Sequence, residues 1–330
     1  MSQPDPGLIL NTLNAFQQTE ALKAAIELDI FTHIADGAAS AAQIAGRCSA
    51  VERTTRILCD FLVVQGFLTK SGSEYGLSPT SAAFLNKHSP MYMGAMSHFL
   101  THEFLRRSFH DLASTVRHGG ARVTEMLEPD HPAWVEFARS MSGFMGLVAD
   151  LLAQKVAKTG PQKVLDIAAG HGMFGLMVAK HNPSAEVFAL DWAPVLEVAK
   201  ENATRLGLAS RFHTIAGSAF QTDLGTGYDL VLVPNFLHHF DAPTNVAFLK
   251  RVKAALKPGG VVAISEFVPN PDRVSPPIPA AFSLQMLATP AGDAYTLAEL
   301  SQMLREAHFH NVEAQALVPS PQTLVLATAS

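Results

Sequence analysis

The stretch from Lys163 to Asp191 constrains the fold of this 330-residue chain more than any other stretch. An apolar run over 164–168 is too short for a helix, and a glycine-rich turn over 169–172 follows it. Residues 173–181 have helical spacing, and a second apolar run then ends on Asp191. This pattern predicts a β–α–β unit. Its glycines would let backbone N–H groups approach a nucleotide-like ligand, and Asp191 would accept hydrogen bonds from ribose hydroxyls.

The C-terminal half continues this alternation, which predicts one α/β domain with a Rossmann-like sheet. Strands are expected at 163–168, 186–191, 211–216, 228–233 and 260–266, and helices at 173–181, 193–206, 243–256 and 297–308. Residues 257–260, Lys-Pro-Gly-Gly, are expected to end a helix and begin the fifth strand. The proline-rich stretch 268–292 is expected to lie over the site. Two last strands, 312–318 and 322–328, have too short a connection for a crossover and predict an antiparallel hairpin.

The N-terminal third has a different pattern. Residues 1–36 carry apolar residues at helical spacing, and two further helices are expected at 41–45 and 51–64, followed by a small hairpin over 67–77. This order is typical of a winged helix, which suggests DNA binding through the second helix. Residues 1–90, however, hold six Lys and Arg against eight Asp and Glu, the wrong sign for a surface that faces phosphates. We therefore expect an oligomerisation or lid module, and no nucleic acid partner.

Residues 91–158 are predicted to be helical and are rich in Met, Phe and His. Most of these side chains are expected to pack in the core, and a minority to line an apolar ligand pocket, because Met and aromatic side chains suit flat apolar ligands. The glycine pair at 119–120 and the stretch 128–132 are expected to break the helices into segments.

Composition limits the class of protein. The net charge of −5 argues against nucleic acid or acidic membranes as partners, and 48% hydrophobic residues can bury a large core. No apolar run is long enough for a membrane span, and the N-terminus has no signal-peptide pattern. The two cysteines, Cys48 and Cys59, match no metal or redox spacing, so a reduced, cytoplasmic protein is expected.

Two nucleotide cofactors fit the glycine turn. The spacing of Gly170, Gly172 and Gly175 matches the dinucleotide fingerprint, which leaves an NAD(P)-dependent oxidoreductase open. Three features favour S-adenosylmethionine (SAM): Asp166 inside the first strand, the antiparallel hairpin at the end of the sheet, and the order of elements around 235–240 and 257–260. A carboxylate just before the turn can reach a cationic ligand and would be poorly placed beside a pyrophosphate.

With these motifs the chain resembles the SAM-dependent O-methyltransferases of the plant caffeate and hydroxyindole type, which have bacterial relatives that modify antibiotics and carotenoid precursors. The resemblance covers nearly the whole chain. It implies a winged-helix-like dimerisation domain over 1–95, a helical linker over 96–158 that contributes to the substrate pocket, and a SAM-binding catalytic domain over 159–330. It also implies a homodimer through the N-terminal domain.

The resemblance carries over a SAM site. It implicates residues that hold the methionine part, the ribose and the adenine of SAM, and one residue on the loop after the fourth strand. These are Asp166, Ala168, Gly170, Gly172, Asp191, Trp192, Gly217, Ser218, Phe220 and Asn235. Two of them depart from the family pattern. Ala168 stands in place of the first glycine of the turn, and Ser218 in place of an acid beside the adenine.

The reaction needs a base. A phenol has a pKa near ~10 and a neutral imidazole one near ~6.5, so a histidine can take the proton as attack develops. His238 follows the fourth strand, at the carboxyl edge where α/β domains bind ligands, and the family's catalytic histidine aligns with it. Glu266, at the end of the fifth strand, matches the acid that orients this histidine. His239 is the competitor, because neighbouring side chains point apart and one of the two should face the pocket.

A second acid is missing. The plant enzymes carry another acid near the histidine, and the matching position here is Ala294, with Asp293 next to it as the candidate replacement. This departure leaves open a variant that binds SAM without transferring a methyl group. The carboxylates have no metal-ligand spacing, so no metal is expected.

The acceptor pocket is expected to be flat and apolar. Its expected lining residues are Phe137, Met141, Phe144, Phe282 and Met286, each with core packing as the alternative. The sequence thus predicts SN2 methyl transfer to a hydroxyl of a small, aromatic acceptor. An NAD(P)-dependent oxidoreductase and a DNA-binding regulator that retains a SAM fold remain the alternatives.

Overall fold

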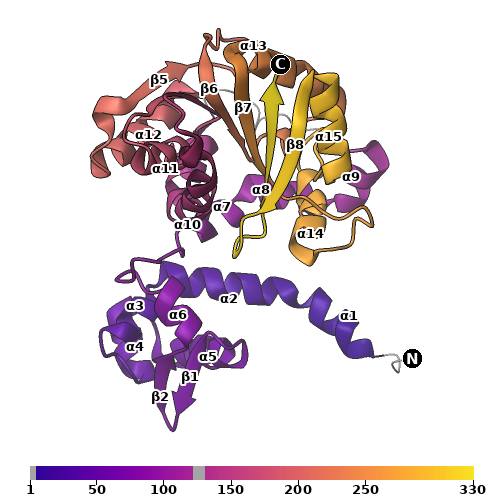
Figure 1. The fold of residues 1–330 in the computed structure, drawn as a ribbon. Helices are drawn as coiled ribbons and strands as arrows, with labels where there is room; N and C mark the ends of the chain where they lie inside the picture. Colours follow the sequence, from indigo (N-terminus) through magenta and orange to yellow (C-terminus); the bar gives the residue numbers. More distant parts are fainter. Residues whose placement is uncertain (1–4, 122–130) are drawn as a thin grey trace. The chain divides into compact units, whose positions relative to one another are not determined.

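The computed structural model describes residues 5–121 and 131–330, so part of the expected helix break at 128–132 lies outside the described residues. The chain divides into two compact units, Met1–Thr101 and His102–Ser330, each of which is described by itself below (Figure 1). Within the described ranges, every helix is too short or too polar to span a bilayer.

The first unit contains helices and one small hairpin. Its elements are α1 (Pro6–Leu13), α2 (Ala15–Glu27), α3 (Ile30–Ala35), α4 (Ala41–Cys48), α5 (Glu52–Val64), β1 (Leu68–Ser71), β2 (Glu74–Leu77), α6 (Pro79–Phe84) and α7 (Met96–Leu100). The expected winged-helix order of two helices and an antiparallel hairpin is present as α4, α5 and β1–β2. Helix α4 runs three residues past its predicted end. A capping box of Ser40 and Gln43 fixes its first turn, and the helix ends at Ser49, which has a left-handed conformation.

The second unit contains a seven-stranded sheet in the order β5-β4-β3-β6-β7-β9-β8. Its strands are β3 (Lys163–Ile167), β4 (Glu186–Asp191), β5 (Phe212–Ala216), β6 (Tyr228–Pro234), β7 (Leu256–Glu266), β8 (Phe309–Ala316) and β9 (Thr323–Ala329). The first five in sequence are parallel, and β9 pairs antiparallel with both β7 and β8. The predicted Rossmann-like sheet with a C-terminal antiparallel hairpin is therefore confirmed.

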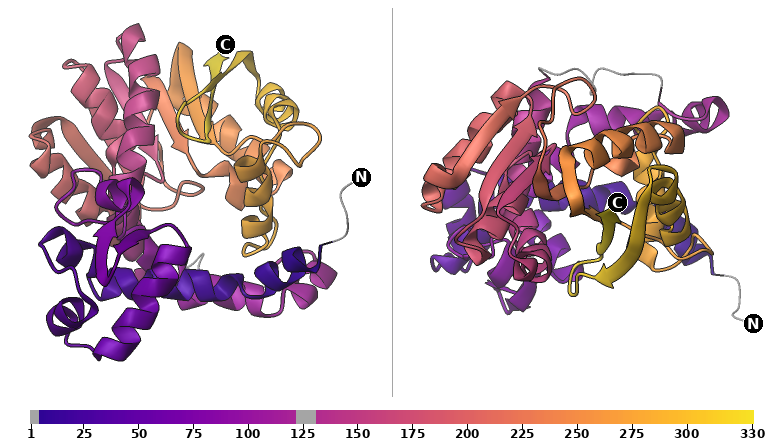
Figure 2. Two further views of the ribbon diagram at one scale, coloured as in Figure 1. Left: turned by 90° about the horizontal axis from the view of Figure 1, so that it is seen from below. Right: turned by 45° about the horizontal axis from the view of Figure 1, so that its top comes forward.

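Helices cover both faces of this sheet (Figure 2). The helices of this unit are α8 (Glu103–His110), α9 (Leu112–His118), α10 (Pro132–Val156), α11 (Met173–His181), α12 (Ala193–Arg205), α13 (Ala242–Ala255), α14 (Pro277–Met286) and α15 (Leu297–Glu306). Helix α10 packs on α11 and α12, and α13 packs on α15. The side chains of β3 and β6 between these layers are almost all buried, which is why both sequences are mainly apolar.

Two strands begin three or more residues before their predicted first residue. Strand β7 begins at Leu256, so residues 257–260 lie within it and do not end the helix. A shift in the β6–β7 register accommodates them: Gly259 has a φ of +76°, and a Cβ on Gly260 would lie 2.9 Å from the carbonyl oxygen of Tyr228. Strand β8 likewise begins three residues early, at Phe309, where a register irregularity beside Asn311 (φ +51°) obscures the alternation of side chains.

Candidate functional site

The glycine turn between β3 and α11 closes onto the end of β4. Ala168, Gly170 and Gly172 have φ angles of +50°, +56° and +72°, a series that brings backbone N–H groups to one side of the turn. The Gly170 N–H donates to Asp191 Oδ2 and the Trp192 N–H to Asp191 Oδ1, both at 2.7 Å. Asp191 thus fixes the turn, and each of its oxygens keeps a lone pair for a further donor.

Asp166 lies under the turn and is fully buried. Its Oδ2 accepts the Gly175 N–H at 2.8 Å, whereas its Oδ1 has no hydrogen-bond partner among the described residues. Burial, together with a smaller effect of the charge of Asp191, raises the pKa of Asp166 to about 8. Burial also raises the pKa of Asp191 to about 6. Two carboxyls at one turn, one of which has a buried oxygen without a donor among the described residues, suit a ligand that carries positive charge.

Gly175 provides a stability prediction for this unit. A Cβ at this position would lie 2.5 Å from Val187 Cγ1 and 3.0 Å from Asp166 Oδ2. We expect Gly175→Ala to lower the free energy of unfolding by about 1–3 kcal/mol, because α11 must move off β4. Gly46→Ala is the matched helical control, since a Cβ there meets nothing within 4 Å. Urea unfolding curves measure both, and equal midpoints would contradict the prediction.

Residues from the ends of β6 and β7 form the second part of the site. His238 lies in a short 3-10 turn after β6, and its Nδ1 is 2.6 Å from Oε2 of Glu266, the last residue of β7. The other oxygen, Oε1, accepts the backbone N–H groups of Phe236, Leu237 and His238 at 3.0, 2.9 and 3.4 Å. An ionised carboxylate in this position requires a proton on Nδ1, which leaves Nε2 of His238 as a proton acceptor.

The two neighbouring histidines have different surroundings. His239 lies with its ring edge-on to Trp134 of α10 (centroids 6.2 Å apart), and its ring is 4.3 Å from that of His238. Burial lowers the pKa of His239 well below its ordinary value, and His238 lowers it further. Phe282 of α14 packs edge-on against His238 at 4.9 Å. The structure therefore brings Glu266 and Phe282 to His238, and Trp134 to His239.

Asp293 does not replace the missing second acid. Its Oδ2 pairs with Arg273 at 3.0 Å, and its Oδ1 accepts the N–H of Ala294 at 2.8 Å, so both oxygens are engaged away from His238. The backbone of Asp293 contacts the histidine turn, because its N–H donates to the carbonyl of His238 at 3.0 Å. Ala294 itself is buried. The residues described around His238 thus contain one orienting carboxylate, Glu266.

Asn235 lies at the carboxyl end of β6, three residues before His238. It follows β6 with a φ of +52°, and its Nδ2 lies 4.0 Å from the sulfur of Met145 on α10. Its Oδ1 accepts from Gln322 Nε2 at 2.7 Å, and Gln322 Oε1 in turn accepts from Ser265 Oγ at 2.7 Å. Gln322 was missed in the sequence, because nothing local in the last hairpin indicates that this buried amide reaches the carboxyl end of β6.

The expected adenine residues lie after β5. Gly217 has a φ of +146° and its N–H donates to the carbonyl of Asp191 at 3.0 Å, which places this turn beside the ribose acid. Ser218 uses its hydroxyl to accept the N–H of Phe220 at 3.2 Å. Phe220 is half-buried in an aromatic cluster with Phe236 and other rings of the core, so part of its surface serves packing.

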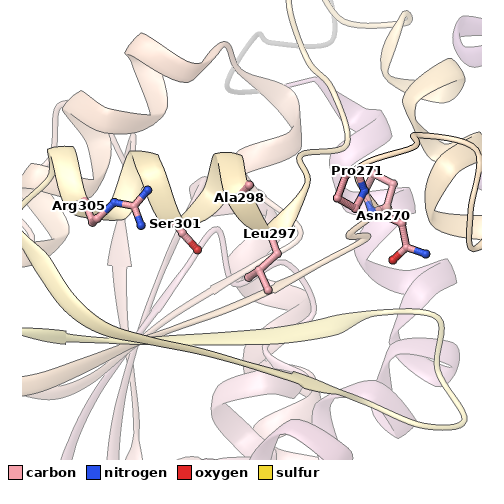
Figure 3. Close-up of a pocket in the computed structure, with 7 residues that line it drawn as sticks. Asn270, Pro271, Leu297, Ala298, Ser301 and Arg305 are labelled. Carbon is pink, nitrogen blue, oxygen red and sulfur yellow. The ribbon is translucent and has the colours of Figure 1, made fainter.

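The expected acceptor residues come from two helices. Phe137, Met141 and Phe144 lie on α10, and Phe282 and Met286 lie on α14. Met141 and Met286 are buried, whereas Phe137 and Phe144 are half-buried. A separate groove, shown in Figure 3, contains none of these residues. It is lined by Pro269, Asn270, Pro271, Leu297, Ala298, Ser301 and Arg305.

Comparisons with known proteins identify the family of this chain. Residues 109–310 match the model of the O-methyltransferase domain, and residues 10–87 match the O-methyltransferase dimerisation domain. The chain is 28% identical to 3-hydroxy-5-methyl-1-naphthoate 3-O-methyltransferase of Streptomyces sahachiroi, over 92% of this chain and 89% of that protein. It is also 28% identical to the tetracenomycin polyketide 8-O-methyltransferase of Streptomyces glaucescens, over 97% and 96% of the two chains.

Solved structures give the same result. The structure of a Nostoc punctiforme protein assigned as an O-methyltransferase has a TM-score of 0.96 and 49% identity, with 99% of this chain and 100% of that chain covered. Human N-acetylserotonin methyltransferase, solved with SAM, has the same fold at a TM-score of 0.86, with 21% identity and 99% of each chain covered. The family model spans more than half of the chain. The chain therefore belongs to the O-methyltransferase family.

Proposed function

We propose that this protein transfers the methyl group of SAM to a hydroxyl of a small aromatic acceptor, with His238 as general base and Glu266 as the residue that orients it. The observation that carries the proposal is the contact of His238 Nδ1 with Glu266 Oε2 at the carboxyl end of β6, next to the strand that holds Asp166. The named relatives support an aromatic acceptor, since one acts on a hydroxynaphthoate and another on tetracenomycin.

The residues around the glycine turn fit SAM. SAM supplies a methyl group on a positively charged sulfur and also carries an ammonium group. The buried Asp166 Oδ1 lacks a donor within the described part of the chain and is suited to that positive charge, and Asp191 is suited to the ribose hydroxyls. The SAM site would be formed by the turn and the residue after β4, which contribute Ala168, Gly170, Gly172 and Trp192. Its edge would be formed by Gly217, Ser218, Phe220 and Asn235. The family match also argues against the NAD(P) alternative.

The chain's own contribution to the reaction is alignment and proton removal. Nε2 of His238 accepts the proton of the acceptor hydroxyl while Glu266 stabilises the imidazolium that forms. Apolar side chains of α10 and α14 would contact the aromatic ring of the acceptor and exclude water from its hydroxyl oxygen. These side chains are Phe137, Met141, Phe144, Phe282 and Met286. One orienting carboxylate is sufficient for this role, so the alanine at position 294 does not exclude methyl transfer.

A homodimer is part of this proposal. The dimerisation-domain match supports it, and so does α1, an apolar helix with no buried residue. Its large side chains are exposed to water, as is the next one along the chain: Leu8, Ile9, Leu10, Leu13 and Phe16. A second copy would cover this stripe. The functional division into 1–95, 96–158 and 159–330, the absence of a nucleic acid partner and a cytoplasmic location all stay predictions.

The test uses SAM with a labelled methyl group and caffeate, N-acetylserotonin and 3-hydroxy-2-naphthoate as acceptors. We expect label in a methyl ether of at least one acceptor. We also expect SAM, and not NADH, to raise the melting temperature, because a ligand that binds only the folded state stabilises it. Stabilisation by NADH alone would overturn the proposal. Stabilisation by SAM without transfer to any of a wider set of phenols would indicate a protein that binds SAM without transferring methyl groups.

The raised pKa of Asp166 predicts that SAM binding depends on pH. A carboxyl of pKa about 8 is protonated at pH 6 and must lose its proton to face a cation, so the Kd for SAM should fall as pH rises from 6 to 7.5. The Kd should change by at most about tenfold per pH unit. Titration calorimetry at several pH values measures this change. We expect Asp166→Asn to bind more weakly and to lose this dependence on pH, and the exposed Asp293→Asn to keep it.

The stability of the ligand-free protein is expected to fall as the pH rises, in contrast to the affinity for SAM. Asp166 and Asp191 have pKa values raised above the ordinary value of 3.8, to about 8 and about 6. Each therefore stabilises the fold fully below pH 3.8, and that contribution is lost as the pH rises through the folded value.

For SAM binding, an equal dependence of the Kd on pH in wild type and Asp166→Asn would contradict the role of Asp166.

A further inference from the structure

The backbone of the turn that carries His238 is held on its N–H side by Glu266. The N–H groups of Phe236, Leu237 and His238 all point to Glu266 Oε1. One carboxylate therefore binds both the imidazole and the backbone that supports it. This leaves the carbonyl side of the same turn to be held by other residues.

Asn245 of α13 holds the carbonyl side. Its Nδ2 donates to the carbonyl oxygen of Leu237 at 2.9 Å and to that of Phe240 at 3.2 Å. These two carbonyls lie on either side of the histidine pair. The side chain of Asn245 is fully buried, and the backbone N–H of the same residue donates to Asp241 at 3.0 Å, within the first turn of the helix. The amide is thus fixed to the end of a helix that packs on the sheet.

The orientation of this amide follows from its partners. Both are carbonyl oxygens, so the NH2 group must face the turn, and the Oδ1 atom points away from it. That oxygen is buried and has no hydrogen-bond partner within residues 5–121 and 131–330. Burying an acceptor without a donor is unfavourable, and an apolar side chain would fill the same space without this cost. Packing alone therefore does not explain an asparagine here, whereas two hydrogen bonds to the turn do.

We propose that Asn245 is a positioning residue that keeps His238 Nδ1 on Glu266 and Nε2 toward the acceptor. The inference rests on the proposed function of His238. Tyr295 supports the same turn from another element, because its hydroxyl donates to the carbonyl of Phe240 at 2.5 Å. The carbonyl oxygen of Phe240 thus accepts two hydrogen bonds, from Asn245 and Tyr295. The carbonyl oxygen of Leu237 also accepts two, from the Asn245 amide and the Phe240 N–H. Loss of Asn245 affects both ends of the turn, and loss of the Tyr295 hydroxyl affects one.

The test compares Asn245→Leu with Val252→Ala. Leucine keeps the volume and removes both donors, and Val252 is a fully buried residue of the same helix that does not contact the turn through a hydrogen bond. For the acceptor that is methylated best among caffeate, N-acetylserotonin and 3-hydroxy-2-naphthoate, we expect Asn245→Leu to lower kcat by about ten- to a hundredfold. The KM for SAM should stay within about twofold of the wild-type value, because the glycine turn is not disturbed. Val252→Ala should keep kcat while it loses thermal stability.

A second readout does not need an acceptor. In protein labelled with 15N-histidine, the proton that His238 Nδ1 shares with Glu266 should give a low-field NMR signal, assigned by its loss in His238→Gln. We expect this signal to shift or disappear in Asn245→Leu and to persist in Val252→Ala. If Asn245→Leu does not fold, Tyr295→Phe, which removes one hydrogen bond to the turn, should still shift the signal.

The outcomes separate the two proposals. An unchanged kcat and an unchanged Nδ1 signal in Asn245→Leu would overturn the positioning role. A kcat that falls equally in Asn245→Leu and Val252→Ala would also overturn it, because general destabilisation would then explain the loss. If the wild-type protein methylates no acceptor, the proposed function fails, and the NMR comparison still decides whether Asn245 positions His238.

Discussion

Replacing His238 by alanine is expected to lower kcat for methyl transfer by a factor of about 10²–10⁴, the usual contribution of a general base. The physical reason is that Nδ1 of this imidazole is held by Glu266 at 2.6 Å, which leaves Nε2 free to take the proton of the acceptor hydroxyl. Binding of SAM should be unchanged, because His238 is not among the residues proposed to hold SAM. Initial rates with labelled SAM and a phenol that the wild-type protein methylates measure kcat, and calorimetry measures the Kd.

The matched control is His239→Ala. His239 is adjacent in the chain and packs on Trp134, but it has no carboxylate to orient it and its pKa is lowered by burial. We expect its kcat to stay within about fivefold of wild type, as is usual for a residue outside the proton path. If His239→Ala lost as much rate as His238→Ala, or if His238→Ala kept the full rate, the assignment of the base would be wrong. A rate that rises with pH in His238→Ala would fit attack by an acceptor already ionised in solution.

The sheet could be predicted from the sequence because its strands are buried on both faces. The strands β3, β4 and β6 are mainly apolar, and each is followed by a helix with clear spacing, so the parallel order and the carboxyl edge follow from connection rules alone. The pairing of His238 with Glu266 could also be anticipated, since both follow adjacent strands. What brings them together is the β6–β7 register, with Pro234 opposite Ser265.

The parts that the sequence did not predict depend on contacts between distant residues. The start of β7 depends on a bulge that Gly259 and Gly260 allow, and glycines there are equally compatible with the end of a helix. The direction of Asp293 depends on Arg273, twenty residues away, which no local pattern links to it. Asn245 lies in a helix among apolar residues, and only the fold shows that its amide reaches the turn before the helix. These are tertiary hydrogen bonds, which leave no periodic pattern in a sequence.

Glu266→Gln tests the orienting role in the clearest way. The side-chain amide oxygen can still accept the N–H groups of Phe236, Leu237 and His238, so the turn should keep its support and the melting temperature should change little. The amide NH2 then faces Nδ1 of His238, which must become an acceptor, and the ring proton moves to Nε2. In this tautomer the imidazole cannot accept a proton from the substrate. We therefore expect kcat to fall by about 10³–10⁴, as when the carboxylate of a catalytic triad is replaced by its amide.

Glu266→Ala separates orientation from support. It removes the acceptor of all three backbone N–H groups as well as the partner of Nδ1, and buried donors without an acceptor cost about 1–3 kcal/mol each. We expect a fall in the free energy of unfolding in this variant and not in Glu266→Gln, with a comparable loss of kcat in both. Since the residues described around His238 supply no second carboxylate, no other acid can restore the tautomer. A Glu266→Gln variant with full activity would show that the carboxylate serves only to hold the turn.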